Sequence, residues 1–375
     1  MKIREFGVEM WMNAYENHCQ LNLAETCVAS LTLNELTRLS GRNDDALSEL
    51  MERPMTYGAI EGAPRLRDAI ATLYTGQTQD NIVTTHGTIG ANALVYKTLV
   101  HPGDHVLAIR PSYQQHYSIA ESQGAEVSAL HLREEDGFLP DIDALKALLK
   151  PNTKLVSLTN PSNPTGALMD RAALEQLIEV IAPTGAYILS DEVYRGTEQN
   201  TEQMTPAMAD LYAKGISTAG MSKAFSLAGL RLGWIAAPQD VIAQVMIHRD
   251  YDTISMGQLD EYFATMALEA KDALLTRSRQ ITRANLATLD AWIAQEPRLS
   301  YVKPQAATIC LLKYDMDIPS HDLCVALLEQ TGILLTPGSA FDMEGYLRIG
   351  FANHPHILED GLPKLSAFLR QYDQT

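Results

Sequence analysis

Residues 221–234 read MSKAFSLAGLRLGW, and this segment decides how the whole chain is interpreted. Lys223 lies between two apolar runs, GISTA at 215–219 and LGWIAA at 232–237, and Arg231 follows it eight positions later. An ammonium group in such surroundings is costly to bury unless it is neutralised or covalently modified. A lysine that forms a Schiff base with a cofactor, with Arg231 holding the cofactor's phosphate, accounts for both charges.

The bulk composition is that of an ordinary soluble globular protein. The 375 residues are 46% hydrophobic and 20% charged, and this length predicts one large domain and a smaller one. The formal net charge of −17 argues against nucleic acid as a partner, because phosphate contacts require a clustered positive surface.

The N-terminus and the cysteines indicate the compartment. Residues 1–6, MKIREF, contain neither the apolar core nor the cleavage site of a secretion signal. No run approaches the ~20 apolar residues that a membrane span needs. The cysteines show no metal-ligand spacing and are interpreted as structural or incidental thiols of a reducing compartment: Cys19, Cys27, Cys310 and Cys324. We therefore expect a cytoplasmic protein with no membrane partner and no metal site.

From about residue 80 onward, short apolar runs alternate with helical patterns. The predicted strands cover residues 81–85, 105–110, 126–132, 154–159, 185–190, 215–219 and 231–237. Apolar residues at three- and four-residue spacing, as in 142–149 and 174–181, predict helices between them. This alternation predicts an α/β fold, a three-layer, mostly parallel seven-stranded sheet with helices on both faces. In such sheets ligands bind beyond the carboxyl ends of the strands.

After Pro238 the pattern changes. The predicted elements are two long helices at 241–275 and 277–295, a strand at 308–314, a helix at 321–330, a strand near 346–351 and a closing helix at 355–371. We therefore expect a large α/β domain at residues 45–255 and a smaller α+β domain built from residues 1–44 and 256–375.

Two strand ends carry signals that are weak on their own. The segment HGTIG at 86–90 opens a predicted helix at 91–100, where backbone N–H groups and the Thr88 hydroxyl would form an anion site. On this segment alone, an ordinary helix N-cap is the preferred interpretation of Thr88. Tyr113, in RPSY after the next strand, lies where its ring would either stack on a planar cofactor or simply pack.

Two further strand ends are more specific. In NPSNPTG at 160–166, two prolines fix an irregular backbone and direct Asn163 away from regular pairing. In ILSDEVY at 188–194, Asp191 directly follows a buried strand. Its carboxylate is interpreted either as a helix N-cap or as the partner of a protonated ring nitrogen, with Tyr194 hydrogen-bonding the ring hydroxyl.

Taken together, these motifs resemble the class I/II aminotransferase family of fold type I pyridoxal-phosphate enzymes, from Tyr57 to Phe351 and in the family's order. The resemblance implies pyridoxal 5'-phosphate as cofactor. Lys223 would form the aldimine with it and then shuttle the substrate proton. Asp191 would pair with the pyridine nitrogen.

The resemblance also implies the remaining cofactor contacts. Asn163 and Tyr194 would bind the phenolic oxygen of the ring, and Tyr113 would stack on it. The phosphate would be held by residues of the two strand-end loops: Gly87, Thr88, Ile89, Ser222 and Arg231.

Substrate binding and assembly follow from the same resemblance. Arg348, in YLRIGF at 346–351, would grip the substrate α-carboxylate bidentately, with Asn163 and Glu25 as further substrate contacts. Tyr57, in TYGAIEG at 56–62, would reach the phosphate in the neighbouring subunit, which implies a homodimer with shared active sites.

Two features depart from the family pattern. Many relatives carry a hydroxyl residue three positions before the lysine, where this chain has Gly220, so one phosphate ligand is expected to be absent. The loop LNLAETC at 21–27 also differs, which leaves the substrate open. Glu25 and His116 are candidate contacts to the substrate side chain, or else plain surface residues.

The sequence thus predicts an aminotransferase that moves an amino group between an L-amino acid and a 2-oxo acid. A weaker likeness to capreomycidine synthases leaves open a cyclase or eliminase, including a carbon–sulfur β-lyase. It rests on TTHG at 84–87, DGFLPD at 136–141, HRDY at 248–251 and the Arg348 motif. A third reading is the effector-binding domain of a transcription regulator. That reading requires a basic winged-helix segment, for which residues 1–50 are too short and too acidic.

Overall fold

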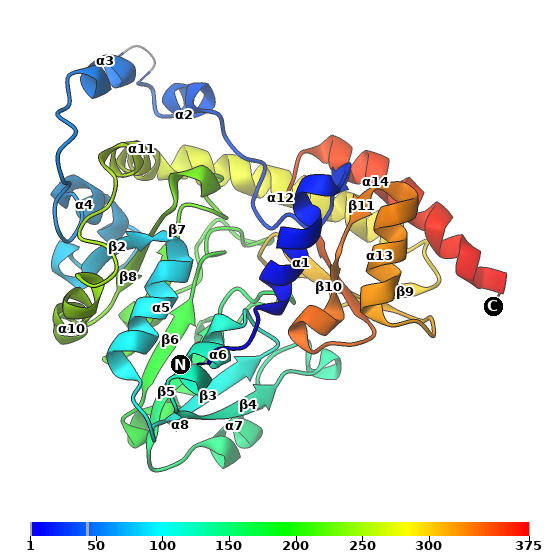
Figure 1. The fold of residues 1–375 in the computed structure, drawn as a ribbon, viewed down its shortest axis with the longest axis horizontal. Coiled ribbons are helices and arrows are strands. Elements are labelled where there is room, and N and C mark those ends of the chain that lie inside the picture. The colour runs from blue at the N-terminus through cyan, green and yellow to red at the C-terminus, as the bar shows by residue number, and fades with distance from the viewer. Residues whose placement is uncertain (1, 43–44, 375) are drawn as a thin grey trace.

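The computed structural model describes residues 2–42 and 45–374, and a central sheet of seven strands organises them (Figure 1). The strand order is β2-β8-β7-β6-β5-β3-β4, and β8 runs antiparallel to both of its neighbours. The other pairs are parallel, which confirms the predicted α/β architecture. The strands are β2 (Ile82–His86), β3 (His105–Arg110), β4 (Glu126–His131), β5 (Thr153–Thr159), β6 (Tyr187–Asp191), β7 (Gly215–Gly220) and β8 (Leu232–Ala236).

Helices cover both faces of this sheet, and neighbouring strand residues face opposite layers. Leu189 packs with α5 (Gly87–Leu99), α6 (Gln115–Ser122) and α10 (Gln239–Arg249) on one face. The adjacent Ile188 packs with α7 (Ile142–Leu148) and α8 (Arg171–Ile181) on the other. Since side chains alternate along a strand, a strand covered on both sides is apolar throughout, and this is why the runs were visible in the sequence.

The predicted helix at 241–275 is wrong. The chain instead forms α10, α11 (Gln258–Glu269) and the start of α12 (Lys271–Ile293), into which the second predicted helix merges. Arg249 explains the first break, because its fully buried guanidinium donates hydrogen bonds to the carbonyl oxygens of Thr84, Ile60 and Ile254. The last of these bonds folds the chain back on itself after α10, and Gly257 then precedes α11.

The C-terminal part of the chain builds a second sheet, in the order β12-β13-β10-β9. Its strands are β9 (Leu299–Tyr301), β10 (Ile309–Tyr314), β12 (Thr336–Pro337) and β13 (Tyr346–Gly350), accompanied by α13 (Ser320–Thr331) and α14 (Pro355–Leu369). The predictions near 308–314, 321–330, 346–351 and 355–371 are confirmed within two residues at each end. The short strands β9 and β12 were not predicted.

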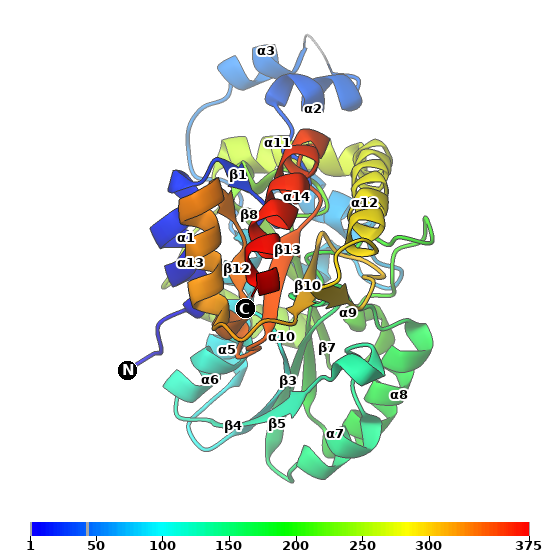
Figure 2. The ribbon, with the colours of Figure 1, turned by 90° about the vertical axis from the view of Figure 1, so that its right-hand side faces the viewer.

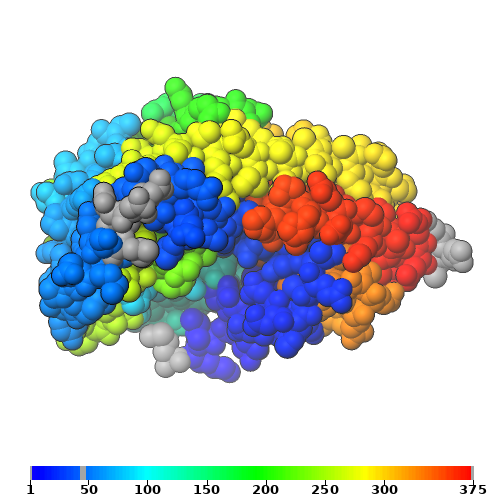
Figure 3. All heavy atoms as spheres, turned by 90° about the horizontal axis from the view of Figure 1, so that it is seen from above, coloured from blue at the N-terminus to red at the C-terminus, as the bar shows by residue number. Residues whose placement is uncertain are grey.

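The N-terminal segment lies against these C-terminal elements (Figure 3). Strand β1 (Leu21–Asn22) pairs in parallel with β11 (Ile333–Leu334), and Trp11 of α1 (Gly7–Tyr15) donates its indole N–H to the Leu335 carbonyl oxygen at 2.9 Å. In Figure 2, α2 (Leu33–Leu39) and α3 (Asp45–Met51) lie together at one end of the molecule. The short helix α4 (Pro64–Ala71) follows and packs against β2 and α11.

Two expectations remain predictions. The predicted domain boundary follows residue 44, and residues 43–44 lie outside the described residues. The compartment of the protein is also untested. Within the described part of the chain, none of the helices combines the length and the apolar composition needed to span a membrane.

Candidate active site

A cavity of about 430 Å³ lies beyond the carboxyl ends of the parallel strands, between them, the N-terminal segment and β13. Most of the predicted site residues line it: Glu25, Thr88, Ile89, Tyr113, Asn163, Asp191, Tyr194, Ser222, Lys223, Arg231 and Arg348. Gly87 precedes Thr88 at the start of α5 and does not line the cavity. Tyr57 does not line the cavity, and its side chain is 77% exposed.

Lys223 follows β7 and points into the cavity from one wall. Its ammonium group donates to the Thr26 hydroxyl and lies 3.5 Å from the Cys27 sulfur. Burial alone would lower the pKa of Lys223, but Cys27, Tyr194 and Glu25 together raise it. Burial raises the pKa of Cys27 to about 11 and that of Tyr194 above its usual value, so Glu25 supplies the negative charge near neutral pH.

Asp191 ends β6 with its carboxylate at the cavity. Its Oδ2 accepts a hydrogen bond of 2.8 Å from Asn92, and its Oδ1 accepts one of 3.2 Å from the backbone N–H of Val193. In the described chain no helix begins at Asp191, so its interpretation as an N-cap is wrong.

His116 is neither a surface residue nor a contact to the substrate side chain. It is completely buried behind Asp191, with Nε2 3.6 Å from Asp191 Oδ2 and Nδ1 2.6 Å from the Ser157 hydroxyl. The helix α6 that carries it packs against the sheet, which turns the imidazole toward the strand ends. His116 therefore supports the carboxylate from behind.

The N-terminus of α5 forms a polar cradle. The helix starts at Gly87, where φ is +67°. Among the described residues, no N-cap side chain accepts a hydrogen bond from the first backbone N–H groups of this helix. Thr88 is therefore not the N-cap, and its buried hydroxyl has no partner among the described residues. A Cβ on Gly87 would lie 2.9 Å from Arg231 Nη2, so the guanidinium closely approaches the helix start. Free N–H groups, an unpaired hydroxyl and an arginine together suit an anion.

Gly220 is explained by the same cradle. A Cβ at this position would lie 2.6 Å from the Thr88 hydroxyl oxygen and 3.0 Å from the Leu232 carbonyl oxygen. The space that a side chain would need is therefore occupied by Thr88. A side chain at position 220 would therefore require the Thr88 hydroxyl to shift.

Arg348 lies at the opposite wall, on β13, and is buried. Its Nη1 donates to Asn163 Oδ1 at 3.2 Å, and its Nη2 donates to the Thr336 hydroxyl at 3.2 Å and to the Ala24 carbonyl oxygen at 3.4 Å. Its Nε has no partner, and no carboxylate in the described residues forms a salt bridge with it. A buried guanidinium paired with neutral groups retains its charge for a ligand.

Tyr113 lies between the cavity and the N-terminal helix. Its hydroxyl donates to Glu9 Oε1 at 2.5 Å, and its ring lies 4.5 Å from the ring of Phe6, measured between centroids. Burial and then the neighbouring Glu9 charge raise the pKa of Tyr113, so the phenol remains protonated. The helix α1 is thereby fixed over the site.

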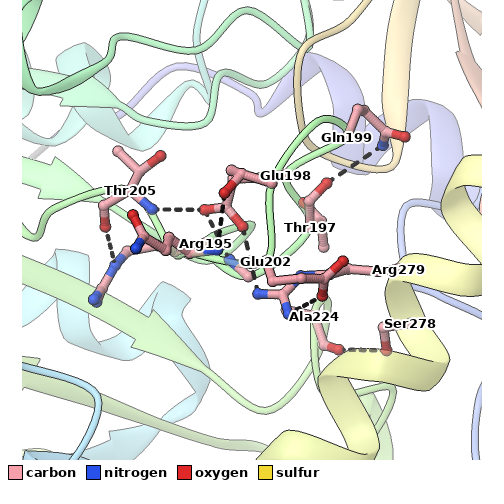
Figure 4. A network of polar contacts seen from close by, with 12 residues as sticks. Arg195, Thr197, Glu198, Gln199, Glu202, Thr205, Ala224, Ser278 and Arg279 are labelled. Carbon is pink, nitrogen blue, oxygen red and sulfur yellow. Dashed lines mark hydrogen bonds and ion pairs between the residues drawn. The ribbon is translucent and has the colours of Figure 1, made fainter.

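The loops that carry Tyr194 and Lys223 are both held by α12 (Figure 4). Arg279 of α12 donates to Glu202 at 3.0 Å, while Glu198 accepts the backbone N–H of Thr205 at 2.8 Å. Ser278, the neighbour of Arg279, donates to the Ala224 carbonyl oxygen at 2.7 Å. One helix therefore sets the relative position of two walls of the cavity.

Sequence reasoning missed several lining residues. Asn92 lies one helical turn after Thr88, a spacing that could have revealed it. Cys27 was interpreted as incidental, yet its sulfur faces Lys223. Glu9 and Glu16 could not be found, because no element was predicted for the segment that carries them.

Comparison with known proteins identifies the family. The family model for class I and II aminotransferases matches residues 30–357. The chain belongs to this family. It is 32% identical to a capreomycidine synthase of Streptomyces vinaceus, over 96% of this chain and 92% of that protein.

Two solved structures are similar in fold over nearly the whole length of this aminotransferase-family chain. A PLP-dependent aminotransferase from Streptococcus suis 89-1591 shows 44% identity and a TM-score of 0.96, covering 99% of both chains. The PLP-dependent cyclase OrfR shows 28% identity and a TM-score of 0.91, covering 99% of this chain and 98% of that one.

The cofactor of this family member is pyridoxal 5'-phosphate (PLP), and its cavity fits that molecule. The unpaired Thr88 hydroxyl at the open start of α5 suits the phosphate group. The Asp191 carboxylate suits a protonated ring nitrogen, and the amine of Lys223 suits an aldehyde.

Proposed function

We propose that this protein is an aminotransferase that moves an amino group between an L-amino acid and a 2-oxo acid. The observation that carries the proposal is the convergence of Lys223, Asp191 and Arg348 on one cavity. These three groups supply an amine nucleophile, a carboxylate for a cationic ring and a cation for an α-carboxylate.

Lys223 would hold the cofactor through its amine and would move the proton at the substrate Cα. Bound PLP supplies an electron-poor ring that stabilises negative charge at that carbon. Asp191, held by Asn92 and backed by His116, keeps the ring nitrogen protonated. Tyr194 and Asn163 orient the phenolic oxygen.

The remaining residues bind and position. Tyr113 would stack on the ring of the cofactor, and its phosphate would be held by Gly87, Thr88, Ile89, Ser222 and Arg231. Arg348 binds the substrate α-carboxylate through the guanidinium nitrogens that face the cavity. Its hydrogen bond to Asn163 couples substrate binding to the cofactor oxygen.

The active form is a homodimer in which Tyr57 reaches the phosphate of the other subunit. Tyr57 is 77% exposed and Tyr251 is 93% exposed, which is unusual for such large rings. The Arg249 guanidinium joins the segments that carry Tyr57 and Tyr251, because it donates hydrogen bonds to the carbonyl oxygens of Ile60 and Ile254. A second copy of the chain would cover this apolar surface.

The domain division remains part of the proposal. Residues 45–255 form the large PLP-binding domain, and residues 1–44 with 256–375 form the small one. The separate apolar cluster around β10, β13, α13 and α14 supports this division, since Trp11 and Leu23 of the N-terminal segment belong to it.

A PLP-dependent cyclase or eliminase is the alternative, favoured by the similarity to a capreomycidine synthase and to OrfR. The two reactions differ in their need for an acceptor. The loaded enzyme should be dialysed free of 2-oxo acids and given an amino acid. Turnover that stops after about one equivalent and resumes with added 2-oxo acid supports aminotransfer; sustained product release without an acceptor contradicts it.

Lys223→Ala tests the assignment of the proton-moving group. The variant should lose turnover, while Lys146→Ala, which removes an exposed lysine on α7, should retain it. Retention of full activity by Lys223→Ala would show that another group acts.

A further inference from the structure

Three carboxylates of the N-terminal segment line the cavity. Glu9 lies on α1, Glu16 lies in the turn that follows it, and Glu25 lies in the loop after β1. Glu25 was a candidate from the sequence; the other two come from a segment whose position only the fold reveals.

None of the three forms a salt bridge with a lysine or arginine within the described residues. Their hydrogen-bond donors are neutral. Tyr113 donates to Glu9, Asn22 donates to Glu16 at 3.5 Å, and the backbone N–H groups after Glu25 donate to it at 2.7 Å. In each of these bonds the acceptor is Oε1.

The carboxylates are close enough to affect one another. Burial raises the pKa of Glu16, and the charges of Glu25 and then Glu9 raise it further. Burial would also raise the pKa of Glu25, but Lys223 and the backbone N–H groups hold it below its usual value. Glu25 is therefore ionised at neutral pH, and negative charge is concentrated on this wall.

The cations of the cavity are already assigned. On the proposed function, Lys223 holds the cofactor, Arg231 its phosphate and Arg348 the α-carboxylate. Arg348 is 2% exposed and forms no salt bridge with a carboxylate of the described residues, so its charge remains available to the substrate α-carboxylate. Lys223 acts on Glu25 at a distance, but on the proposed function its amine is taken up by the cofactor. The substrate side chain then meets three carboxylates that form no salt bridge with a lysine or arginine in the described residues.

We propose that Glu9, Glu16 and Glu25 form a subsite for the cationic end of the substrate side chain, so that the substrate is an amino acid with a guanidinium or ammonium group. An acidic side chain would meet like charges, and an apolar one would remove water from the carboxylates without replacing it. A guanidinium supplies several donors for the free carboxylate oxygens. This subsite rests on the proposed function for its orientation, because Arg348 must hold the α-carboxylate.

Equilibrium binding tests the subsite without turnover. The two probes are 5-guanidinopentanoate and 5-ureidopentanoate, which have the same length and a carboxylate but differ in charge, and neither has an α-amino group. Calorimetry on the PLP-loaded enzyme should give a dissociation constant about 10- to 100-fold lower for the guanidino compound, the range expected for charge-assisted hydrogen bonds. Added salt should reduce the difference.

Three isosteric variants locate the effect. Glu9→Gln, Glu16→Gln and Glu25→Gln each remove a charge but keep an oxygen for the neutral donors described above. Each variant should reduce the ratio of the dissociation constants of the two probes. Glu179→Gln removes an exposed charge on α8, which does not line the cavity, and should leave the ratio unchanged.

Kinetics separate this proposal from the proposed function. L-Arginine and L-ornithine should exceed L-citrulline in kcat/KM by about tenfold or more. The proposed subsite would be overturned if the two probes bound with equal dissociation constants and if none of the three variants changed the ratio of these constants. If the guanidino probe binds as expected but no amino acid transfers its amine, the subsite stands and the aminotransferase assignment fails.

Discussion

Gly220→Ser restores the hydroxyl that many relatives carry, and the structure predicts that it weakens cofactor binding. The new Cβ would lie 2.6 Å from the Thr88 hydroxyl oxygen, 3.0 Å from the Leu232 carbonyl oxygen and 3.3 Å from the Gly233 Cα. Two of these three neighbours are backbone atoms, so Thr88 must move.

The expected magnitude has two parts. Overpacking a tight site destabilises a protein by about 1–3 kcal/mol, which should lower the thermal midpoint of the apoenzyme. A displaced Thr88 also loses a hydrogen bond to a charged group, worth about 1.5–3 kcal/mol. The second part raises the PLP dissociation constant by about 10- to 100-fold.

The assay is a titration of apoenzyme with PLP, followed by absorbance. Gly229→Ala is the matched control, since it lies in the connection between β7 and β8 and a Cβ there has no atom within 4 Å among the described residues. Thr88→Val should weaken binding similarly. The double variant should be little worse than either single one, because both changes act by removing the contact of the Thr88 hydroxyl with the phosphate. If Gly220→Ser binds PLP as tightly as the parent, the account of this cradle is wrong.

Three further predictions address other walls of the site. Arg348→Lys keeps the charge but loses the pair of parallel N–H donors, and it should raise the KM for the amino acid by about 100-fold without changing PLP affinity. An unchanged KM would exclude Arg348 as the carboxylate ligand. Burial raises the pKa of Glu192 to about 7, so the native state binds this proton more tightly than the unfolded one and stability falls as pH rises from about 4.5 to 7. We expect Glu192→Gln to raise the free energy of unfolding relative to the parent, and this difference should be about 2 kcal/mol larger at pH 8 than at about pH 5.5. A difference that does not change with pH, measured by denaturation, would refute this. Tyr57→Ala and Lys223→Ala should each be nearly inactive alone but regain activity when their subunits are mixed, since one dimer site is then intact, and no recovery would contradict shared sites.

The sequence predicted the central sheet well because its strands are buried on both faces. The interior of the run at 105–110, VLAI at 106–109, has no polar residue, and the limits of this strand were recovered. The break after Arg249 was invisible, since the apolar spacing continues through it and the interrupting bonds go to distant carbonyl oxygens.

The site was predicted unevenly for similar reasons. Motif residues at strand ends, such as Asp191 and Lys223, meet because parallel strands end at one edge. Residues brought in by tertiary packing were missed or misread, since nothing local marks them. His116 was interpreted as a contact to the substrate side chain or as a surface residue, and it lies behind Asp191. Glu9 reaches the cavity on a helix of the N-terminal segment, which pairs with β11 through β1.

The most direct test of the central claim is the position at which the cofactor attaches. The PLP-loaded enzyme should be reduced with borohydride, digested and mapped by mass spectrometry. We expect a pyridoxyl group on the peptide that contains Lys223, and its loss when excess amino acid is added before reduction. A pyridoxyl group on any other lysine, or its absence from the reduced protein, would contradict the account.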